Sequence, residues 1–297
     1  MKALADYVHS QGLKFGVYTS RGTYTCQMRP ASLNYEAIDG ASYCEWGLDY
    51  IKIDGCRGSQ DMNTSWSRFH ESFQQCITNG GRYILESVET CGDPDTCGQW
   101  VGTVSDLWRT GGDIQCNWNS VLAQMNANDR MVNIAKPGNF NDPDMLEVGN
   151  PGLTLDEQHS HFGMWCIASS PLLISTDIIH ASKQTIILLT KTEAIEVNQD
   201  LGLNGRIQGR SVVLHKQPNT RVWVKPLADG KRYAVFLVNI GNTAQILTVS
   251  FTDLNFPGTS AAVRDLWNEK DIVNITNGVF TSSRAVPSHG SVFITLQ

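Results

Sequence analysis

The sequence lacks long apolar runs and an excess of basic residues. No stretch of about 18 apolar residues occurs, so we expect no segment that spans a membrane. Lys and Arg number 23 against 29 Asp and Glu, and the net charge of −6 argues against nucleic acid or an anionic membrane as the partner. The hydrophobic fraction of 41% over 297 residues indicates a folded core in one large domain or two moderate ones. We therefore expect a globular protein with a neutral or cationic ligand.

Cysteine is too scarce for a disulfide scaffold, yet more frequent than in most proteins of reducing compartments: the chain has eight. Two sequons, at Asn63 and Asn274, are candidate glycosylation sites and indicate the same oxidising environment. We expect a secreted, vacuolar or lysosomal protein. The segment 1–12 reads as an amphipathic helix that ends at glycine, so this chain is not expected to contain a signal peptide.

Several catalytic motifs are also absent. There is no Gly-x-Ser-x-Gly elbow, no dinucleotide-binding glycine fingerprint and no P-loop. The seven histidines fall on predicted helices or in the C-terminal part, away from the predicted strand ends where a metal site would be built. We therefore expect no cofactor and no metal.

Residues 1–200 show strands alternating with helices. This alternation predicts a parallel sheet, and six such units favour a (β/α) barrel over a short dinucleotide-binding unit. The predicted strands are 13–18, 48–53, 82–88, 106–108, about 139–140, and 171–175. The predicted helices are 1–12, 32–46, 65–79, 119–128, 155–168, and a pair that ends near 196. Thr154 and Glu157 have the spacing of a capping box.

The pattern changes near Gly205, where short strands follow one another without helices. Turn signals separate the segments 211–216, 221–227, 232–239, 245–251, 262–266 and 291–296. We predict a second domain, an antiparallel β-sandwich over 201–297, after a catalytic barrel over 1–200.

Carboxylates gather at the predicted strand ends, which is where barrel enzymes place their active sites. Paired carboxylates, one ionised and one protonated, suit cleavage of a glycosidic bond. Asp54 follows Lys52 by two residues on one strand, so both side chains face the same way and the cation favours an ionised nucleophile. Asp113 follows Arg109 across a glycine-rich loop, which could place a proton donor over the leaving oxygen. Ordinary ion pairs or loop caps are the alternative reading of each pair.

Several blocks resemble the signatures of glycoside hydrolase family 27, the retaining α-galactosidases and α-N-acetylgalactosaminidases. These blocks are YTSRGTYTC at 18–26, YIKIDGC at 50–56, WRTGGDI at 108–114 and NDPDML at 141–146. The segments 263–267 and 286–290 are similar to that family's β-sandwich. The resemblance covers essentially the whole chain and implies a (β/α)8 TIM-type barrel without its first two strands, followed by the sandwich. Residues that grip the sugar from those two strands have no counterpart here.

The resemblance implies release of terminal α-D-galactose, or a related sugar, by double displacement. It implies Asp54 as the nucleophile and Asp113 as the acid/base, whose carboxyl groups should be about 5–5.5 Å apart for retention. A carbohydrate is the implied partner, and the sequence leaves monomer and homodimer open. The implied sugar contacts are Tyr18, Lys52, Arg109, Asp144 and Met145. A disulfide between Cys26 and Cys56 is implied beside the site.

The strand end near residue 89 departs from the family pattern, which bears on the choice of sugar. Either Glu89 or Thr90 takes the family's glutamate position, and we favour Glu89. Cys91 and Cys97 are candidates for a small local disulfide. Alternatives are a catalytically impaired sugar-binding fragment, or action on β-L-arabinopyranosides, α-N-acetylgalactosaminides or α-1,6-glucans. We expect Cys44, Cys76 and Cys166 to be buried apolar residues.

Overall fold

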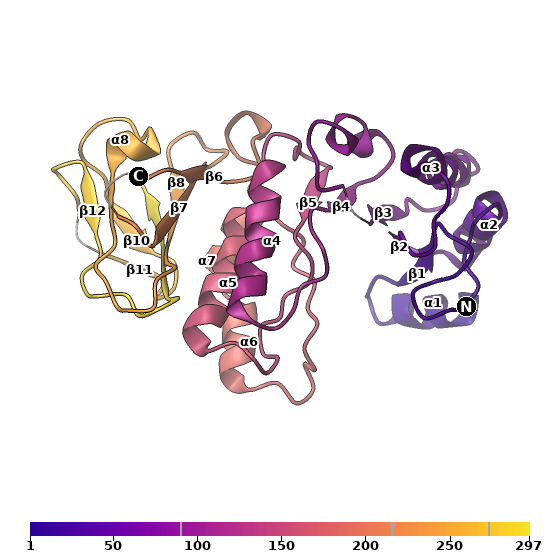
Figure 1. Ribbon diagram of the computed structural model, residues 1–297, viewed down its shortest axis with the longest axis horizontal. Helices are drawn as coiled ribbons and strands as arrows, with labels where there is room; N and C mark the ends of the chain where they lie inside the picture. The colour runs from indigo at the N-terminus through magenta and orange to yellow at the C-terminus, as the bar shows by residue number, and fades with distance from the viewer. Residues whose placement is uncertain (90, 215–216, 273) are drawn as a thin grey trace. The chain divides into compact units, whose positions relative to one another are not determined.

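The computed structural model describes residues 1–89, 91–214, 217–272 and 274–297. These residues form two compact units, Met1–Gly112 and Asp113–Gln297, and Figure 1 traces the chain through both. Within the described residues, no helix has the length and apolar character needed to cross a bilayer.

The first unit alternates strands with helices, as the sequence predicts. Its strands are parallel and are hydrogen-bonded in the order β1, β2, β3, β4. The elements are α1 (Lys2–Ser10), β1 (Gly16–Ser20), α2 (Glu36–Trp46), β2 (Tyr50–Asp54), α3 (Met62–Thr78), β3 (Leu85–Val88) and β4 (Leu107–Arg109), with 3-10 turns η1 (Cys97–Gln99) and η2 (Val101–Thr103) before β4.

Side chains along β2 alternate between the buried core and the more exposed face of the sheet. Ile51 and Ile53 are fully buried, whereas Lys52 and Asp54 are half-buried on the opposite face. A strand places successive side chains on opposite faces, so the polar pair points away from the apolar pair. The predicted common orientation of Lys52 and Asp54 is confirmed.

Helices α2 and α3 pack against each other and are joined by a disulfide between Cys44 and Cys76. The prediction that these two cysteines serve only as buried apolar residues is wrong, because packing of the two helices brings their sulfurs together in a disulfide. Gly81 lies against this bridge: a Cβ there would lie 2.4 Å from the Cys76 sulfur and 2.7 Å from the Cys44 sulfur. The turn after α3 therefore has no room for a side chain.

The second unit begins with helices and one short strand. Its elements before the sandwich are α4 (Trp118–Arg130), β5 (Phe140–Asp142), α5 (Leu155–Ile167), α6 (Lys183–Leu189), α7 (Thr192–Gln199) and η3 (Leu203–Gly205). The capping box at the start of α5 is confirmed, since Thr154 and Glu157 bond reciprocally. Residues 171–175 do not form the predicted strand. They are paired through one isolated parallel bridge, between Ile174 and Leu146. Their partner segment follows Asp144, whose φ of 82° interrupts an extended conformation.

The rest of the second unit is antiparallel. A six-stranded sheet has the order β11, β10, β13, β8, β7, β6, and a two-stranded sheet pairs β12 with β9. The strands are β6 (Arg210–Val212), β7 (Thr220–Pro226), β8 (Tyr233–Asn239), β9 (Thr248–Ser250), β10 (Val263–Asp265), β11 (Lys270–Asp271), β12 (Val279–Thr281) and β13 (Ser291–Leu296), with α8 (Phe251–Leu254) after β9. Prediction missed β11 and β12. The predicted strand 211–216 ends in residues 215 and 216, which lie outside the described part of the chain.

One hydrophobic core joins the six-stranded sheet to the preceding helices. Trp223 and Phe236 from the sheet cluster with Phe162 and Trp165 from α5. Fully buried Lys225 of β7 strengthens this junction, since its ammonium donates to Ser169 Oγ at 2.6 Å and to the carbonyls of Val197 and Asp200 at 2.6 and 2.7 Å. The compact unit thus combines helices with the sandwich, and the domain boundary at 200/201 stays a prediction.

Candidate active site

The carboxylate of Asp54 is held at the end of β2 by two donors. Its Oδ1 accepts from the Gly55 amide at 2.7 Å, and its Oδ2 accepts from the Tyr18 hydroxyl. Tyr18 lies on β1, in register with Lys52 of β2. Burial, together with the bond to Asp54, raises the pKa of the Tyr18 phenol, so it stays protonated and donates. The carboxylate is therefore fixed in orientation.

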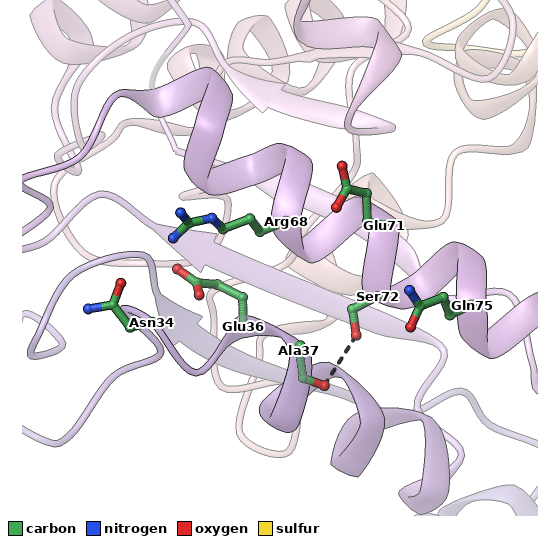
Figure 2. Close-up of a pocket in the computed structure, with 7 residues that line it drawn as sticks. All are labelled: Asn34, Glu36, Ala37, Arg68, Glu71, Ser72 and Gln75. Carbon is green, nitrogen blue, oxygen red and sulfur yellow. Dashed lines mark hydrogen bonds between the residues drawn. The ribbon is translucent and has the colours of Figure 1, made fainter.

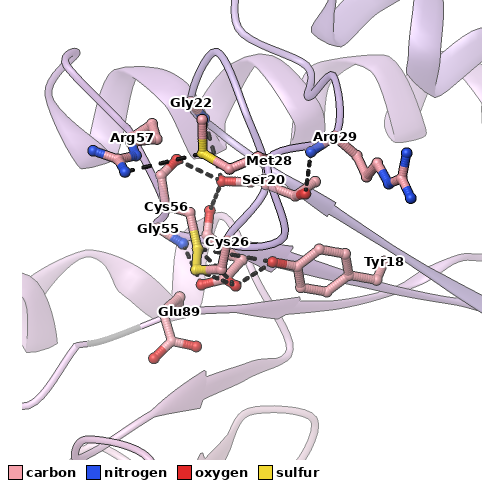
Figure 3. Close-up of a disulfide and its surroundings, with 12 residues drawn as sticks. Tyr18, Ser20, Gly22, Cys26, Met28, Arg29, Gly55, Cys56, Arg57 and Glu89 are labelled. Carbon is pink, nitrogen blue, oxygen red and sulfur yellow. Dashed lines mark hydrogen bonds between the residues drawn. A yellow bond between two sulfur atoms is a disulfide. The ribbon is translucent and has the colours of Figure 1, made fainter.

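A disulfide between Cys26 and Cys56 lies against this carboxylate (Figure 3). The two sulfurs are 3.6 and 3.1 Å from Asp54 Oδ2. Ser20 Oγ donates to the Cys56 carbonyl at 2.8 Å, which ties the loop after β2 to the end of β1. The two sulfurs and Asp54 Oδ2 have the spacing of a metal-binding group, but a disulfide offers no thiolate, so this donor set does not suit a metal ion.

Glycine is required next to the disulfide. A Cβ at Gly22 would lie 2.0 Å from the Cys56 carbonyl oxygen, closer than any real contact. The loop that carries Cys26 can approach the loop after β2 only because residue 22 has no side chain.

Two cations flank Glu89, which follows β3. Lys52 Nζ lies 2.9 Å from Glu89 Oε2, and Arg109 Nη1 lies 3.7 Å from the same oxygen. Arg109 also donates to the carbonyl of Gly112 at 2.5 Å, which orders the glycine loop. The structure thus brings the predicted residues Tyr18, Lys52 and Asp54 together on neighbouring strands, with Glu89 and Arg109 joined to them through Lys52. Thr90, the alternative to Glu89, lies outside the described residues.

The second unit contributes a separate group of predicted residues. Asp113 is exposed, and the next amide, that of Ile114, donates to Asp144 Oδ2 at 2.8 Å. Asp142 Oδ1 accepts from the Asp144 amide at 2.9 Å, and this turn stabilises the left-handed conformation of Asp144. Met145 is 37% exposed, so it is available for contact with a ligand.

Two residues beside the predicted site residues were not identified by sequence reasoning. Trp165, a fully buried core residue of α5, donates its indole N–H to the Asp144 carbonyl at 2.7 Å. Ser87, buried on β3, lies in register with Lys52. The strand period could have indicated Ser87, whereas nothing in the periodicity of α5 predicts the direction of the Trp165 indole.

Glu86 is a carboxylate of β3 that is in register with Ile51, so its side chain lies on the opposite face of the sheet from Lys52. It is buried and pairs with His70 of α3 at 2.8 Å, so it faces the helix. Burial raises the pKa of Glu86 to about 7, and the Glu86 carboxylate raises the pKa of His70. This pair belongs to the packing of α3 on the sheet.

The remaining candidates are spread over both units. Cys91 and Cys97 form a disulfide, whereas Cys166 is free and buried, as predicted. Asn63 lies near the start of α3, half-buried, and accepts from Ser67 at 3.2 Å. Asn274 is exposed outside the strands.

Both parts of the chain are similar to domains of known proteins. Residues 1–200 match the family described as alpha galactosidase A, and residues 217–296 match the alpha galactosidase C-terminal beta sandwich domain. Alpha-galactosidase 2 of Arabidopsis thaliana is 42% identical over 270 residues, which cover 90% of this chain and 65% of the relative. A probable alpha-galactosidase of Dictyostelium discoideum is 36% identical, with 100% and 75% covered.

The fold is also that of a solved relative. The crystal structure of alpha-galactosidase I from Mortierella vinacea superimposes with a TM-score of 0.89 at 30% identity, covering 100% of this chain and 79% of that one. The predicted class, a barrel-type parallel α/β sheet followed by an antiparallel sandwich, is confirmed. The chain spans slightly less than two thirds of the Arabidopsis relative. The chain belongs to the α-galactosidase family, glycoside hydrolase family 27.

Proposed function

We propose that this protein is a retaining exo-glycoside hydrolase that releases terminal α-D-galactose from oligosaccharides or glycoconjugates. The observation that carries the proposal is the Asp54 carboxylate, oriented by Tyr18 and the Gly55 amide at the end of a parallel strand. Active sites of barrel enzymes lie at such strand ends. Family membership supports the same activity.

Asp54 is the proposed nucleophile. Its carboxylate oxygen attacks the anomeric carbon while the bond from that carbon to the glycosidic oxygen breaks, and Asp113 gives its proton to the departing oxygen. Water then attacks the covalent intermediate. Asp113, now a carboxylate, takes a proton from this water, and the bond between Asp54 and the sugar breaks. The two inversions together retain the configuration.

The remaining predicted residues position the sugar. Lys52 and Arg109 donate to sugar hydroxyls, and Glu89, held between them, accepts. Asp144 adds a second acceptor, and Met145 covers an apolar face of the ring. Tyr18 keeps the Asp54 carboxylate pointed at the anomeric carbon. No cofactor enters this mechanism.

The proposal includes an oxidising secretory route. Three disulfides, Cys26–Cys56, Cys44–Cys76 and Cys91–Cys97, support it, since such bonds persist outside reducing compartments. Exposed Asn274 is the sequon most open to glycosylation, and Asn63 is the second.

Covalent trapping tests the assignment. We expect the chain to hydrolyse a chromogenic α-galactoside, and a 5-fluoro-α-galactosyl fluoride to label the peptide that contains Asp54, as read by mass spectrometry. Asp54→Asn should abolish turnover and labelling while the thermal midpoint stays near that of the parent. Asp6→Asn, on exposed α1, is the matched control and should behave as the parent. Turnover at parental rate by Asp54→Asn, or a label on another residue, would overturn the assignment.

A further inference from the structure

A polar cavity lies on the first unit between the start of α2 and the outer face of α3. Its volume is about 290 Å³, at the lower end of the range for small-molecule sites. Asn34 and Glu36 line it from the α2 side, and Arg68, Glu71, Ser72 and Gln75 line it from α3. None of these residues is among those assigned to the galactosidase site.

Glu36 is the unusual member of this cavity. The residue is only 3% exposed, and its Oε1 has no hydrogen-bond partner among the described residues. A buried carboxylate oxygen without a donor is costly, and native structures rarely leave one. Figure 2 shows the Glu36 side chain extending into the space between the two helices, beside Asn34 and below Arg68. This oxygen therefore calls for an external donor.

Arg68 lies across the cavity from Glu36. Its guanidinium donates to Gln60 Oε1 at 3.0 Å, and Gln60 in turn donates to Asn34 Oδ1 at 3.1 Å. This chain of hydrogen bonds holds both walls, and Arg68 and Glu36 do not form an ion pair in the described structure. An acceptor and a donor thus face one cavity without satisfying each other.

A hydroxyl group fits between such partners because it donates and accepts at once. A simple cation would meet the Arg68 charge, and a simple anion would meet Glu36 and Glu71. A neutral polyol can give a proton to the Glu36 carboxylate and take one from the Arg68 guanidinium. Gln75 and Glu71, four residues apart on α3, offer further partners on the same wall.

We infer that this cavity is a non-catalytic binding site for one sugar residue, recognised through neighbouring hydroxyls by Glu36 and Arg68. No aromatic ring lines the cavity, so a sugar would be held by hydrogen bonds and bind weakly, with a dissociation constant on the order of millimolar. The inference stands whether or not Asp54 cleaves galactosides.

Titration by nuclear magnetic resonance tests it. Galactose is added to isotope-labelled chain carrying Asp54→Asn, which removes turnover, and the amides of residues 34–37 and the Arg68 side chain are followed. We expect saturable shifts at these positions. Glu36→Gln and Arg68→Met, each added to Asp54→Asn, should weaken binding at them by about tenfold or more. Glu45→Gln, on the exposed side of α2, and Arg284→Met, in the second unit, are the controls and should leave it unchanged.

Other outcomes decide against the inference. Saturation at residues 34–37 by Ca²⁺ or by methylammonium, with none by galactose, would mean a cation site and overturn it. Absence of any saturable shift up to roughly 100 mM galactose would do the same, since affinity would fall below the expected range. Hydrolysis of a chromogenic galactoside, measured in Glu36→Gln with Asp54 intact, should match the parent. Failure of the proposed catalytic activity alone would leave the titration result unaffected.

Discussion

Lys52 Nζ lies 2.9 Å from Glu89 Oε2, so an ion pair links the end of β2 to the residue that follows β3. Asp54, two residues after Lys52, is instead held by a phenol and a backbone amide. The two carboxylates at this edge therefore differ in their partners. Glu89 is paired with cations, whereas Asp54, the proposed nucleophile, accepts hydrogen bonds from neutral donors.

Glu89→Gln tests the role of this ion pair. The neutral amide cannot balance the positive charges of Lys52 and Arg109, so both cations lose their ion pair. The sugar also loses a charged hydrogen-bond acceptor. We expect kcat/KM for an α-galactoside to fall by roughly 10- to 100-fold, with KM raised. Steady-state kinetics measure the change. Glu45→Gln, on the exposed side of α2, should show parental kinetics, and equal kinetics in both variants would contradict the role of Glu89.

The two long disulfides form a matched pair for testing. Cys26–Cys56 and Cys44–Cys76 close loops of 30 and 32 residues, so chain entropy predicts a similar stabilisation of about 3–4 kcal/mol for each. Only the first lies against Asp54. Replacing both cysteines of a pair by serine or alanine should lower the free energy of unfolding alike. Loss of Cys26–Cys56 should also lower kcat, because the Asp54 carboxylate loses its packing.

Denaturant titration and kinetics on the two double variants separate these effects. The variant without Cys44–Cys76 should retain kcat at a temperature well below its unfolding midpoint. Equal loss of kcat in both variants would show that the Cys26–Cys56 bridge acts on activity only through stability.

The Glu86–His70 pair predicts a pH dependence of stability. The pKa of Glu86 is about 7 in the folded chain, against an ordinary value of 4.5 for a solvated glutamate. The pKa of His70 is raised as well. The folded state therefore binds more protons than the unfolded state between about pH 4.5 and 7, so stability falls as pH rises through this window. Glu86→Gln should flatten this fall by about 1–3 kcal/mol.

Chemical denaturation at pH 5, 6, 7 and 8 measures that difference. The comparison uses the slope of parent minus variant, which removes contributions from other titrating groups. Glu45→Gln, an exposed carboxylate on α2, provides the control slope. A parent whose stability rises from pH 5 to 7 more steeply than that of Glu86→Gln would contradict the prediction.

Lys225→Met should destabilise the second unit. The ammonium is fully buried and satisfies one hydroxyl and two carbonyls near the end of α7. Methionine fills a similar volume but leaves these oxygens unpaired, at a cost of about 2–4 kcal/mol. Lys231→Met, at an exposed turn, should change stability little. Thermal unfolding compares the two, and an equal midpoint in both would show that the buried bonds are not stabilising.

Local pattern predicted the elements that carry the proposed chemistry. Alternating exposure along β2 placed Lys52 and Asp54 on one face because strand geometry alone decides it. The spacing of Thr154 and Glu157 predicted the start of α5 because a capping box involves only neighbouring residues. Roles at Asp54 and Asp113 remain predictions, since chemistry is not visible in a pattern of burial.

Features that depend on tertiary packing were not predictable. The Cys44–Cys76 bridge needs the relative placement of two helices, which periodicity does not give. Strands β11 and β12 have two and three residues, too few for an alternating pattern. The apolar run 171–175 looked like a strand, but a strand also needs an extended partner, and the turn at Asp144 removes it.

The shared core of the second unit connects its β-sheet to the loop that carries Asp144. Trp165 packs in the same cluster as Phe236 of β8, and its indole also holds the Asp144 carbonyl. A change of volume at β8 is therefore transmitted through one aromatic side chain to the loop that carries Asp144 and Met145. Substitutions in the buried face of the sandwich should therefore alter the position of Asp144 and Met145, the proposed sugar contacts, so the two parts of this unit cannot change in sequence independently.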